Sequence, residues 1–338
     1  MPVCVTFIFT SLVPHWGSGT SSIQIPCSGD FFTSAFIYLN KIFAKIYDLK
    51  LMQFELVLIS LSFTSGNRKR YPKFCPRFFS FKLSMAIVLA FTNQKGGVGK
   101  TTSAVNVALS MAVTEVSTLL IDLDPQSNAT TGLADLFEET NGSIYDVLLR
   151  GDGIKEAITH TSFSHLDIIS STHDLVGAEI ELVSVMAREY QLQKAIRPIK
   201  KKYDIIIIDC PPSLGLLTIN ALTASDALVI PIQCEYYALE GLGQLLNTVR
   251  LVQRHLNKKL EITGILMTMY DSRLNLSKQV VEEVDSFFKE KLFKTFIHRN
   301  VRLSEAPSFG KPALLYDANS TGARNYMSLT EEILQRVS

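Results

Sequence analysis

Ten residues at positions 93–102, with the sequence NQKGGVGKTT, constrain the fold of this chain more than any other feature. They follow the apolar run at 87–91 and precede a helix predicted over 103–113. A strand, a glycine-rich turn and a helix form the context of a phosphate-binding loop. Glycines let backbone N–H groups curl around phosphate oxygens, and the start of a helix favours the same anion. The sequence therefore predicts a phosphate site at this turn.

The loop departs from the general G-x-x-x-x-G-K-[ST] pattern, because Gln94 occupies the position of the first glycine. Lys100 is predicted to bind the β- and γ-phosphates, and the Thr101 hydroxyl to ligate Mg²⁺. A second lysine, Lys95, begins the loop, where it could reach phosphates held by another subunit. The alternative is a glycine-rich turn with two solvated lysines, but the flanking strand and helix favour the phosphate site.

Three aspartates follow strongly apolar segments. Asp122 lies near the end of the apolar run at 118–123, and Asp124 follows that run directly. Asp209 follows the four isoleucines of 205–208. A run this apolar suits a parallel strand buried on both faces. Ligands of open α/β sheets bind beyond the carboxyl ends of the strands, so these carboxylates are predicted to face the phosphate site. Asp209 would hold a water on Mg²⁺. The alternative is that the aspartates only cap strand ends.

Strand and helix patterns alternate along the chain after residue 85, which predicts a doubly wound, mostly parallel α/β sheet with helices on both faces, as in P-loop NTPases. We expect loops over 128–165. Predicted strands cover 87–91, 118–123, 166–170, 203–209, 226–232 and 262–269. Predicted helices cover 103–113, 175–199, 214–224 and 322–337, and the segment 233–241 leads into a further long amphipathic helix that ends at about residue 256.

The loop resembles the deviant Walker A motif of the ParA/MinD superfamily, and its spelling TNQKGGVGKTT resembles the ParA/Soj branch of chromosome and plasmid partitioning ATPases. The sequence IDLDPQ at 121–126 is similar to the Walker A′ motif of that family. Segments 233–241, 270–277 and 299–312 are similar to ParA/Soj segments as well. The resemblance covers residue 85 to about residue 338 and does not extend to residues 1–84.

This resemblance implies an ATPase that uses ATP and Mg²⁺. The nucleotide-binding residues would be Lys95, Gly96, Gly97, Val98, Gly99, Lys100, Thr101 and Thr102. Thr101 would ligate the metal directly, Asp209 and Asp122 would hold it through water, and Asp124 would orient the attacking water. Lys95, Lys100 and Asp124 would be the catalytic residues. Lys95 would reach across an ATP-dependent homodimer to the phosphates of the other subunit, and Gly96 would leave room for the facing loop.

The resemblance also implies non-specific DNA binding through Arg273 and Arg302, switched on by dimerisation, and a ParB-like (Spo0J-like) partner that stimulates hydrolysis. Residues 85–338 carry a net charge of about −5, so any affinity for DNA must come from a local basic patch. Arg299 and Lys311 could extend it. The alternative is scattered solvated cations. Whether the cargo is a chromosome or a plasmid stays open.

One departure from the family concerns the nucleotide base. The usual Ile-Pro-Arg of the family appears as Ile297-His298-Arg299. In relatives that proline lies by the base, so His298 would stack on adenine or alter the pocket.

Three other functions compete with this interpretation. A MinD-like positioning ATPase acting at a membrane would need a basic amphipathic tail, whereas the C-terminal helix has acidic residues between its apolar ones. An iron protein of the nitrogenase-reductase type would need two cysteines per subunit, and Cys210 and Cys234 both follow strands. A ligase such as dethiobiotin synthetase shares the fold and would need a small-molecule pocket, but the segments at 233–241 and 299–312 speak against it.

Residues 1–84 differ from the rest in composition. They hold nine Lys/Arg against three Asp/Glu, or +6, while the whole chain carries +1. No helical or strand period runs through them, and their apolar runs are shorter than the ~20 residues that cross a bilayer. We expect a non-native extension upstream of a true start at Met85. A targeting or disordered tail and a separate domain are the alternatives.

The five cysteines form no CxxC pair and no disulfide framework, which favours a reducing cytoplasm. We therefore expect a cytoplasmic, nucleoid-associated protein with no membrane contact.

Overall fold

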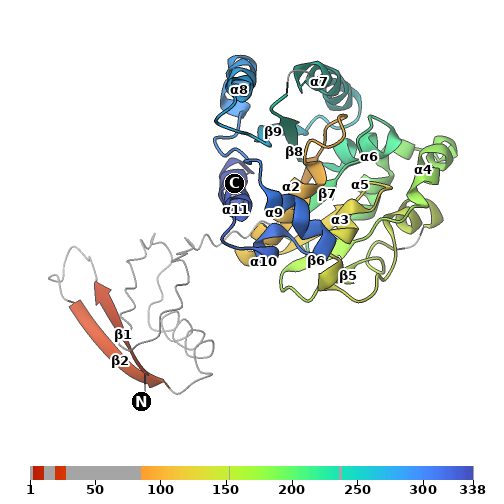
Figure 1. Ribbon diagram of the computed structural model, residues 1–338. Helices are drawn as coiled ribbons and strands as arrows, with labels where there is room; N and C mark the ends of the chain where they lie inside the picture. Colours follow the sequence, from red (N-terminus) through yellow and green to blue (C-terminus); the bar gives the residue numbers. More distant parts are fainter. Residues whose placement is uncertain (1–2, 11–19, 28–84, 152, 236–237, 338) are drawn as a thin grey trace, which may run out of the picture. The chain divides into compact units, whose positions relative to one another are not determined.

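The computed structural model describes residues 3–10, 20–27, 85–151, 153–235 and 238–337 (Figure 1). The chain divides into two units, 1–75 and 76–338. In the first unit, β1 (Val3–Thr10) and β2 (Thr20–Cys27) pair antiparallel, so the expectation of no strand pattern there is wrong for these two segments. The other residues up to 84 lie outside the described parts, and an extension ending at residue 84 stays a prediction.

The second unit is built on a seven-stranded sheet with the order β5-β6-β4-β7-β3-β8-β9. Every neighbouring pair is parallel except β5 with β6. This topology confirms the predicted doubly wound sheet. The strands are β3 (Ile87–Phe91), β4 (Thr118–Asp122), β5 (Thr159–His160), β6 (Leu166–Ile169), β7 (Ile205–Asp209), β8 (Ala227–Gln233) and β9 (Glu261–Thr268).

Helices cover both faces of this sheet (Figure 1). Alternate residues of β7 point to opposite sides: Ile206 and Ile208 enter one apolar cluster, and Ile205 and Ile207 enter the other. Because both faces are covered, the strand is apolar throughout. The first cluster is built with α4 (Leu175–Glu181), α5 (Gln191–Ile196), α6 (Leu216–Ala224), α7 (Ala238–His255) and α8 (Asn275–Phe288), and the second with α2 (Lys100–Val113), α3 (Asn128–Thr131) and α11 (Thr321–Val337).

The C-terminal helix packs on the core, as predicted. Its apolar residues are buried, and the hydroxyl of Tyr326 lies 3.1 Å from the Ser103 hydroxyl on α2. Two short helices that the sequence did not predict, α9 (Val301–Glu305) and α10 (Ala313–Tyr316), precede it. No helix in the described part of the chain is both long and apolar enough to cross a membrane.

The single helix predicted over 175–199 is wrong. After α4 the chain makes a 3₁₀ turn at Leu182–Ser184, and a second turn at Arg188–Tyr190 leads into α5. Between these turns Ala187 adopts a φ of 52°, a left-handed conformation that ends any α-helix. The Gln191 amide stabilises this turn by donating to the carbonyl oxygens of Met186 and Ala187. A periodic apolar pattern continues through the break, which is why the sequence suggested one helix.

We expect Ile207→Ala to lower the free energy of unfolding by about 2–5 kcal/mol, because Ile207 is fully buried in the central strand and its truncation leaves a cavity. Ile180→Ala is the matched control, since Ile180 is 77% exposed and should change stability by no more than about 0.5 kcal/mol. Urea unfolding measures both. Equal effects of the two substitutions would contradict the central placement of β7.

Candidate phosphate and metal site

The loop between β3 and α2 has the backbone of a phosphate-binding turn. Gly97 and Gly99 have φ values of 74° and 83°, a left-handed region in which a side chain would be strained. Gly99 is also the N-cap residue, so α2 begins at Lys100 with its amino end at the loop. Anions bind readily at such a helix end. The predicted phosphate loop therefore has suitable geometry, and the glycines explain it.

Lys100 is a buried cation, with only 5% of its surface exposed. Its Nζ donates to the carbonyl oxygen of Lys95, 3.0 Å away, which folds the side chain back along the loop. Burial lowers the pKa of Lys100, and the nearby charges of Asp209 and Asp124 oppose this effect. The side chain thus lies between the loop and the carboxylates, where phosphate oxygens would give it further partners.

Asp122 and Asp209 lie side by side, because β4 and β7 are adjacent parallel strands and the two residues are in register. Burial raises the pKa of Asp209 well above its ordinary value, and the negative charges of Asp122 and Asp124 raise it further. The Thr101 hydroxyl lies close enough to lower this pKa, yet neither carboxylate oxygen of Asp209 has a hydrogen bond of ordinary geometry to any residue that the structure describes. Such a buried, unsatisfied carboxylate calls for a partner.

The oxygens of Asp122 are already engaged. Oδ2 accepts hydrogen bonds from the backbone N–H and the hydroxyl of Thr130, and Oδ1 accepts from the N–H of Asp124. Burial raises the pKa of Asp122 to about 6 despite these bonds. Asp124 is 5% exposed and accepts from the N–H of Gln126. Asp122 therefore positions the loop that carries Asp124, and its predicted contact with a water on the metal stays a prediction.

The residues fit a divalent cation. Mg²⁺ prefers oxygen ligands and keeps several of its waters. The Asp209 oxygens without a hydrogen bond and the neighbouring Thr101 hydroxyl supply such ligands, and a cation there would offset the mutual repulsion of the three carboxylates. Thr102 follows in the first turn of α2, and Val98 is buried in the loop. The described structure thus gathers the predicted phosphate and metal residues at one end of the sheet.

Lys95 points away from this cluster and pairs with Glu235. Its Nζ lies 2.8 Å from Oε2 of Glu235, in an ion pair whose two side chains are 37% and 48% exposed. Gln233 holds the other oxygen of the glutamate at 2.6 Å. At Gly96, a β-carbon would meet nothing within 4 Å. Nothing in the described part of this subunit therefore explains why glycine stands at position 96.

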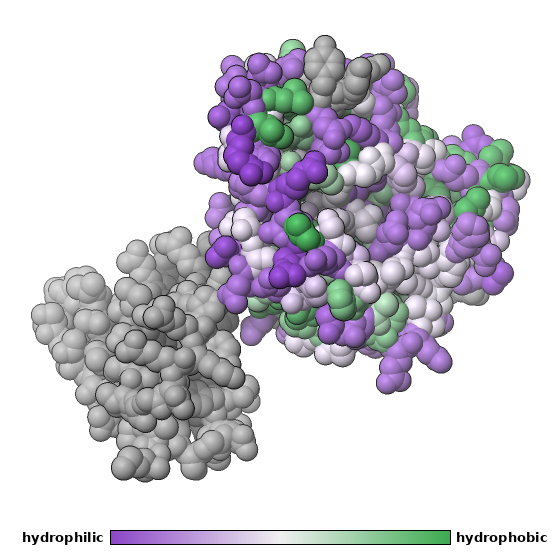
Figure 2. All heavy atoms as spheres, viewed as in Figure 1, coloured by the Kyte–Doolittle hydropathy of each residue, from purple (hydrophilic) through white to green (hydrophobic). Residues whose placement is uncertain are grey.

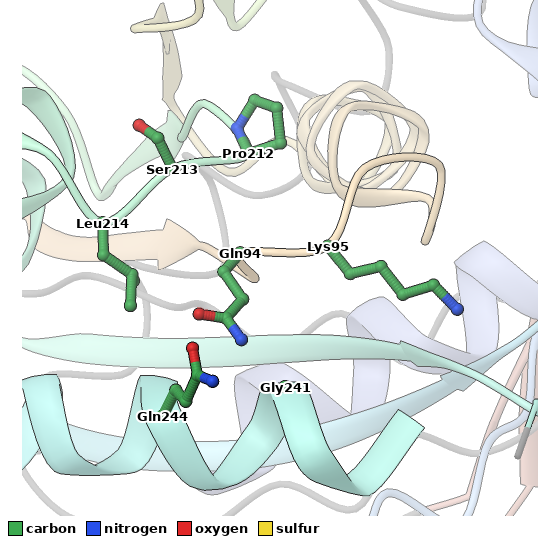
Figure 3. Close-up of a pocket in the computed structure, with 7 residues that line it drawn as sticks. All are labelled: Gln94, Lys95, Pro212, Ser213, Leu214, Gly241 and Gln244. Atoms are coloured by element: carbon green, nitrogen blue, oxygen red, sulfur yellow. The ribbon is translucent and has the colours of Figure 1, made fainter. Parts of the chain in front are cut away.

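An open pocket of about 500 Å³ borders Lys95 (Figure 3). Gln94 and Gln244 point toward each other across it, and the segment Pro212 to Leu214 forms another wall. Gly241 on α7 lets the Gln94 amide approach, because a β-carbon there would lie 3.2 Å from it. Sequence reasoning did not predict these lining residues. The available signal in the sequence was that Gln94 belongs to the phosphate loop and that residues 212–214 closely follow Asp209.

The predicted DNA-contact segments begin side by side. A bridge between Tyr270 and His298 sets the chain after β9 beside residues 297–299. Hydrogen bonds from Arg273 lower the pKa of Asp271, and the charge of Arg299 lowers it further. Each predicted arginine has a carboxylate partner: Arg273 binds Asp271 in bidentate fashion at 2.9 and 2.7 Å, and Arg302 lies 2.8 Å from Glu305 and 3.3 Å from Asp317. Lys311 pairs with Asp135. The positive charge of these three side chains is therefore largely neutralised within the chain.

His298 is partly buried and has two neighbours. Its backbone N–H and its Nδ1 both lie 3.2 Å from the side-chain oxygen of Asn325, and its ring meets the Tyr270 ring edge-on with centroids 5.5 Å apart. The predicted contact with a base stays a prediction.

Comparison with known proteins agrees with this geometry. A family model described as an AAA domain matches residues 86–262. The chain is 56% identical over 249 residues to the sporulation initiation inhibitor protein Soj of Bacillus subtilis, covering 74% of this chain and 98% of Soj. It is 53% identical over 249 residues to the chromosome partitioning protein ParA of Myxococcus xanthus, covering 74% and 88%.

A solved structure agrees as well. Cobyrinic acid a,c-diamide synthase from Mycobacterium smegmatis, with bound ADP and magnesium, superposes with a TM-score of 0.64 at 34% identity, covering 73% of this chain and 93% of that one. Its fold matches the sheet described above. The identities to Soj and ParA are higher, extend over nearly the whole of Soj, and agree with the motifs at the phosphate loop and after β4. The chain therefore belongs to the ParA/Soj family of partitioning ATPases.

Proposed function

We propose that this protein is an ATP-dependent DNA partitioning ATPase. Its nucleotide-bound dimer binds DNA, and hydrolysis of ATP releases the protein from the DNA. The observation that carries the proposal is the buried set of Lys100, Asp209 and Thr101 beneath a glycine loop, with both Asp209 oxygens free of hydrogen bonds. A relative that is 53% identical to this chain is named for chromosome partitioning, and a structural relative holds ADP and magnesium.

Each residue has a defined role in the proposed reaction. The loop N–H groups and Lys100 would hold the phosphates, and Thr101 and Asp209 would hold Mg²⁺, which would supply positive charge to neutralise the transferred phosphoryl group. Asp124 lies on the turn after β4 and orients the attacking water. Its neighbour Asp122 keeps that turn in place through Thr130. Burial of these groups strengthens their electrostatic action, since the local dielectric is low.

The dimer follows from Lys95 and Gly96. Lys95 stands at the rim of the loop, and its side chain pairs with Glu235 in an exposed ion pair that is easily broken, so it can turn to phosphates in a facing subunit. The empty space around Gly96 fits the close approach of a second loop. ATP would thus lie between two subunits and favour their association.

DNA binding would depend on this association. In one subunit the arginine patch is offset by Asp271, Glu305 and Asp317, so its attraction for a polyanion is weak. Two linked patches engage the same DNA with a high effective concentration, so the dimer binds although the single subunit does not. A ParB-like protein that stimulates hydrolysis completes the proposal, with the protein acting on the nucleoid in the cytoplasm.

The competing functions fit the site less well. Cys210 and Cys234 are buried, and burial raises the pKa of both thiols, that of Cys234 to about 12. Protonated, buried thiols do not suit the ligation of an iron–sulfur cluster shared between subunits. A membrane-acting switch would need a basic amphipathic helix, whereas α11 is packed on the core.

We expect Asp124→Ala to bind ATP and dimerise while hydrolysis falls at least about a hundredfold, because the water loses its orienting group. Lys100→Ala is the matched control that should lose nucleotide binding altogether. Light scattering with and without a non-hydrolysable ATP analogue measures the dimer, and phosphate release measures turnover. A wild-type protein that stays monomeric when saturated with the analogue would refute the proposed switch.

We expect Glu235→Gln to favour the ATP-dependent dimer about twofold to fivefold, because Lys95 is released from an exposed ion pair worth about 0.2–1 kcal/mol. Sedimentation at graded protein concentrations gives the dimer dissociation constant. Lys95→Gln, the opposite half of the pair, should weaken the dimer instead. If both substitutions shift dimerisation in the same direction, Lys95 does not act across the interface.

We expect the double substitution Arg273→Glu and Arg302→Glu to weaken DNA binding by about tenfold or more and to flatten its salt dependence, because phosphate contacts are lost and carboxylates are added. ATP binding should be unchanged. Lys155→Glu with Lys201→Glu makes the same charge change at two exposed sites elsewhere and is the control. Fluorescence anisotropy with a DNA duplex at several salt concentrations measures binding. Equal losses in both double variants would mean that net charge, not this patch, binds DNA.

A further inference from the structure

The side chain of Thr268, the last residue of β9, packs against the phosphate loop. Its Oγ1 lies 2.8 Å from the carbonyl oxygen of Val98 in that loop and 3.1 Å from the carbonyl oxygen of Ile232 on β8. A β-carbon at Gly99 would lie 3.7 Å from the Thr268 methyl group, so this methyl packs beside the residue that caps α2. Thr268 thus contacts the two loop residues that precede Lys100.

The hydroxyl of Thr268 fixes this end of the loop. Thr268 is 2% exposed and Val98 is 1% exposed, so the hydrogen bond between them is shielded from water. A hydroxyl has one proton, and Val98 offers the nearer of the two acceptors. Loss of this donor would leave a buried carbonyl of the loop short of a partner, which is costly. The Asn93 amide holds the other end of the loop by donating to the carbonyl oxygen of Pro231 at 2.7 Å.

The chain that follows Thr268 holds one of the predicted DNA-contact segments. The N–H of Tyr270 donates to the carbonyl oxygen of Ile297 at 3.0 Å, and the carbonyl oxygen of Tyr270 accepts from the N–H of Arg299 at 3.1 Å. These two bonds tie the start of the segment 299–312 to the backbone only two residues after Thr268.

The other predicted DNA-contact segment begins at the same place. Asp271 follows directly and binds Arg273 through two hydrogen bonds. Between Thr268 and Asp271, Met269 has a φ of 51°, a left-handed conformation that a methionine rarely adopts. Residues held in such conformations cluster at ligand sites and switch regions. The backbone that joins the phosphate loop contact to both segments is therefore strained at one position.

The two segments reach the surface although Thr268 does not. The side chains of Arg273 and Arg302 are 86% and 50% exposed. Figure 2, which has the same view as Figure 1, shows hydrophilic purple spheres over α9, the helix that carries Arg302. One buried side chain thus lies between the buried phosphate site and these exposed arginines.

We propose that Thr268 is a positioning residue that couples the phosphate loop to both predicted DNA-contact segments. A phosphate group that favours one position of the Val98 carbonyl favours one setting of Thr268, and the chain after Thr268 follows it. This coupling acts within each subunit, so it adds to the effect of pairing two subunits. By linkage, DNA on these segments tightens ATP binding by the same factor by which ATP tightens DNA binding. The inference rests on the proposed function, in which one protein binds both ligands.

The test replaces Thr268 by valine, which keeps the shape of the side chain without its hydroxyl, and by serine, which keeps the hydroxyl. We expect Thr268→Val in the full-length protein to bind a non-hydrolysable ATP analogue with Mg²⁺ about threefold to tenfold more weakly, as titration calorimetry measures. At saturating analogue, anisotropy should show DNA affinity at least about threefold below that of the wild type, with an unchanged dimer dissociation constant from sedimentation. Thr268→Ser should restore both affinities.

Thr118→Val is the matched control. The Thr118 hydroxyl also donates to a backbone carbonyl oxygen, that of Val116 at 2.8 Å, and Thr118 is fully buried. It is the first residue of β4, so it lies at the amino end of that strand, opposite to the phosphate site. This variant should bind the analogue and DNA as the wild type does. Melting curves establish that all variants fold.

Other results would overturn the proposal. Equal losses in the two valine variants would make the effect a general loss of stability, and wild-type affinities in Thr268→Val would remove the loop contact. Weaker analogue binding with wild-type DNA affinity at saturation, or a DNA loss that weaker dimerisation explains in full, would refute the coupling. If the analogue does not raise the DNA affinity of the wild type, the proposed function fails instead, and the analogue affinities still test the loop contact.

Discussion

The structure depends on one electrostatic arrangement: a lysine ammonium and three carboxylates buried at the end of a parallel sheet. Lys100, Asp122, Asp124 and Asp209 are each no more than 5% exposed. Burial and the charges of the other two carboxylates raise the pKa of Asp209, and the charge of Lys100 opposes this effect. Asp122 is stabilised separately, by hydrogen bonds from the N–H groups of Asp124 and Thr130. Burying these like charges together costs free energy, and a phosphate group with a divalent cation would supply the partners that offset this cost. This cost in free energy couples the fold to nucleotide binding.

The sheet makes this arrangement possible. Adjacent parallel strands bring Asp122 and Asp209 into register, and β3 beside β7 delivers the glycine loop to the same edge. Covering both faces with helices keeps water from the strands and fixes their ends. Residues far apart in the chain thus act on one ligand, as is usual at the carboxyl ends of such sheets.

The surface complements this buried core. Lys95 and its glutamate partner lie at the rim of the site, and the two predicted DNA-contact arginines carry carboxylate partners of their own. These ion pairs are exposed, and exposed ion pairs contribute little to stability. Exchanging such a carboxylate for the phosphate of a ligand therefore costs little free energy.

Much of this protein was determined by the sequence itself. Periodicity placed the six longer strands and the nucleotide helix, because a parallel strand covered on both faces must be apolar throughout, and the glycine spacing with Lys100, Thr101 and three strand-end aspartates identified the candidate site. The break at Ala187 was not predictable, since the apolar period continues across it and the bonds of Asn220 on α6 to Arg188 and Leu192, which hold the chain after the break, exist only in the tertiary structure. The pairing of Lys95 with Glu235 and of Arg302 with Asp317 was also decided by tertiary structure. Those partners meet because the chain folds back on itself, and local pattern carries no information about which distant charges will be neighbours.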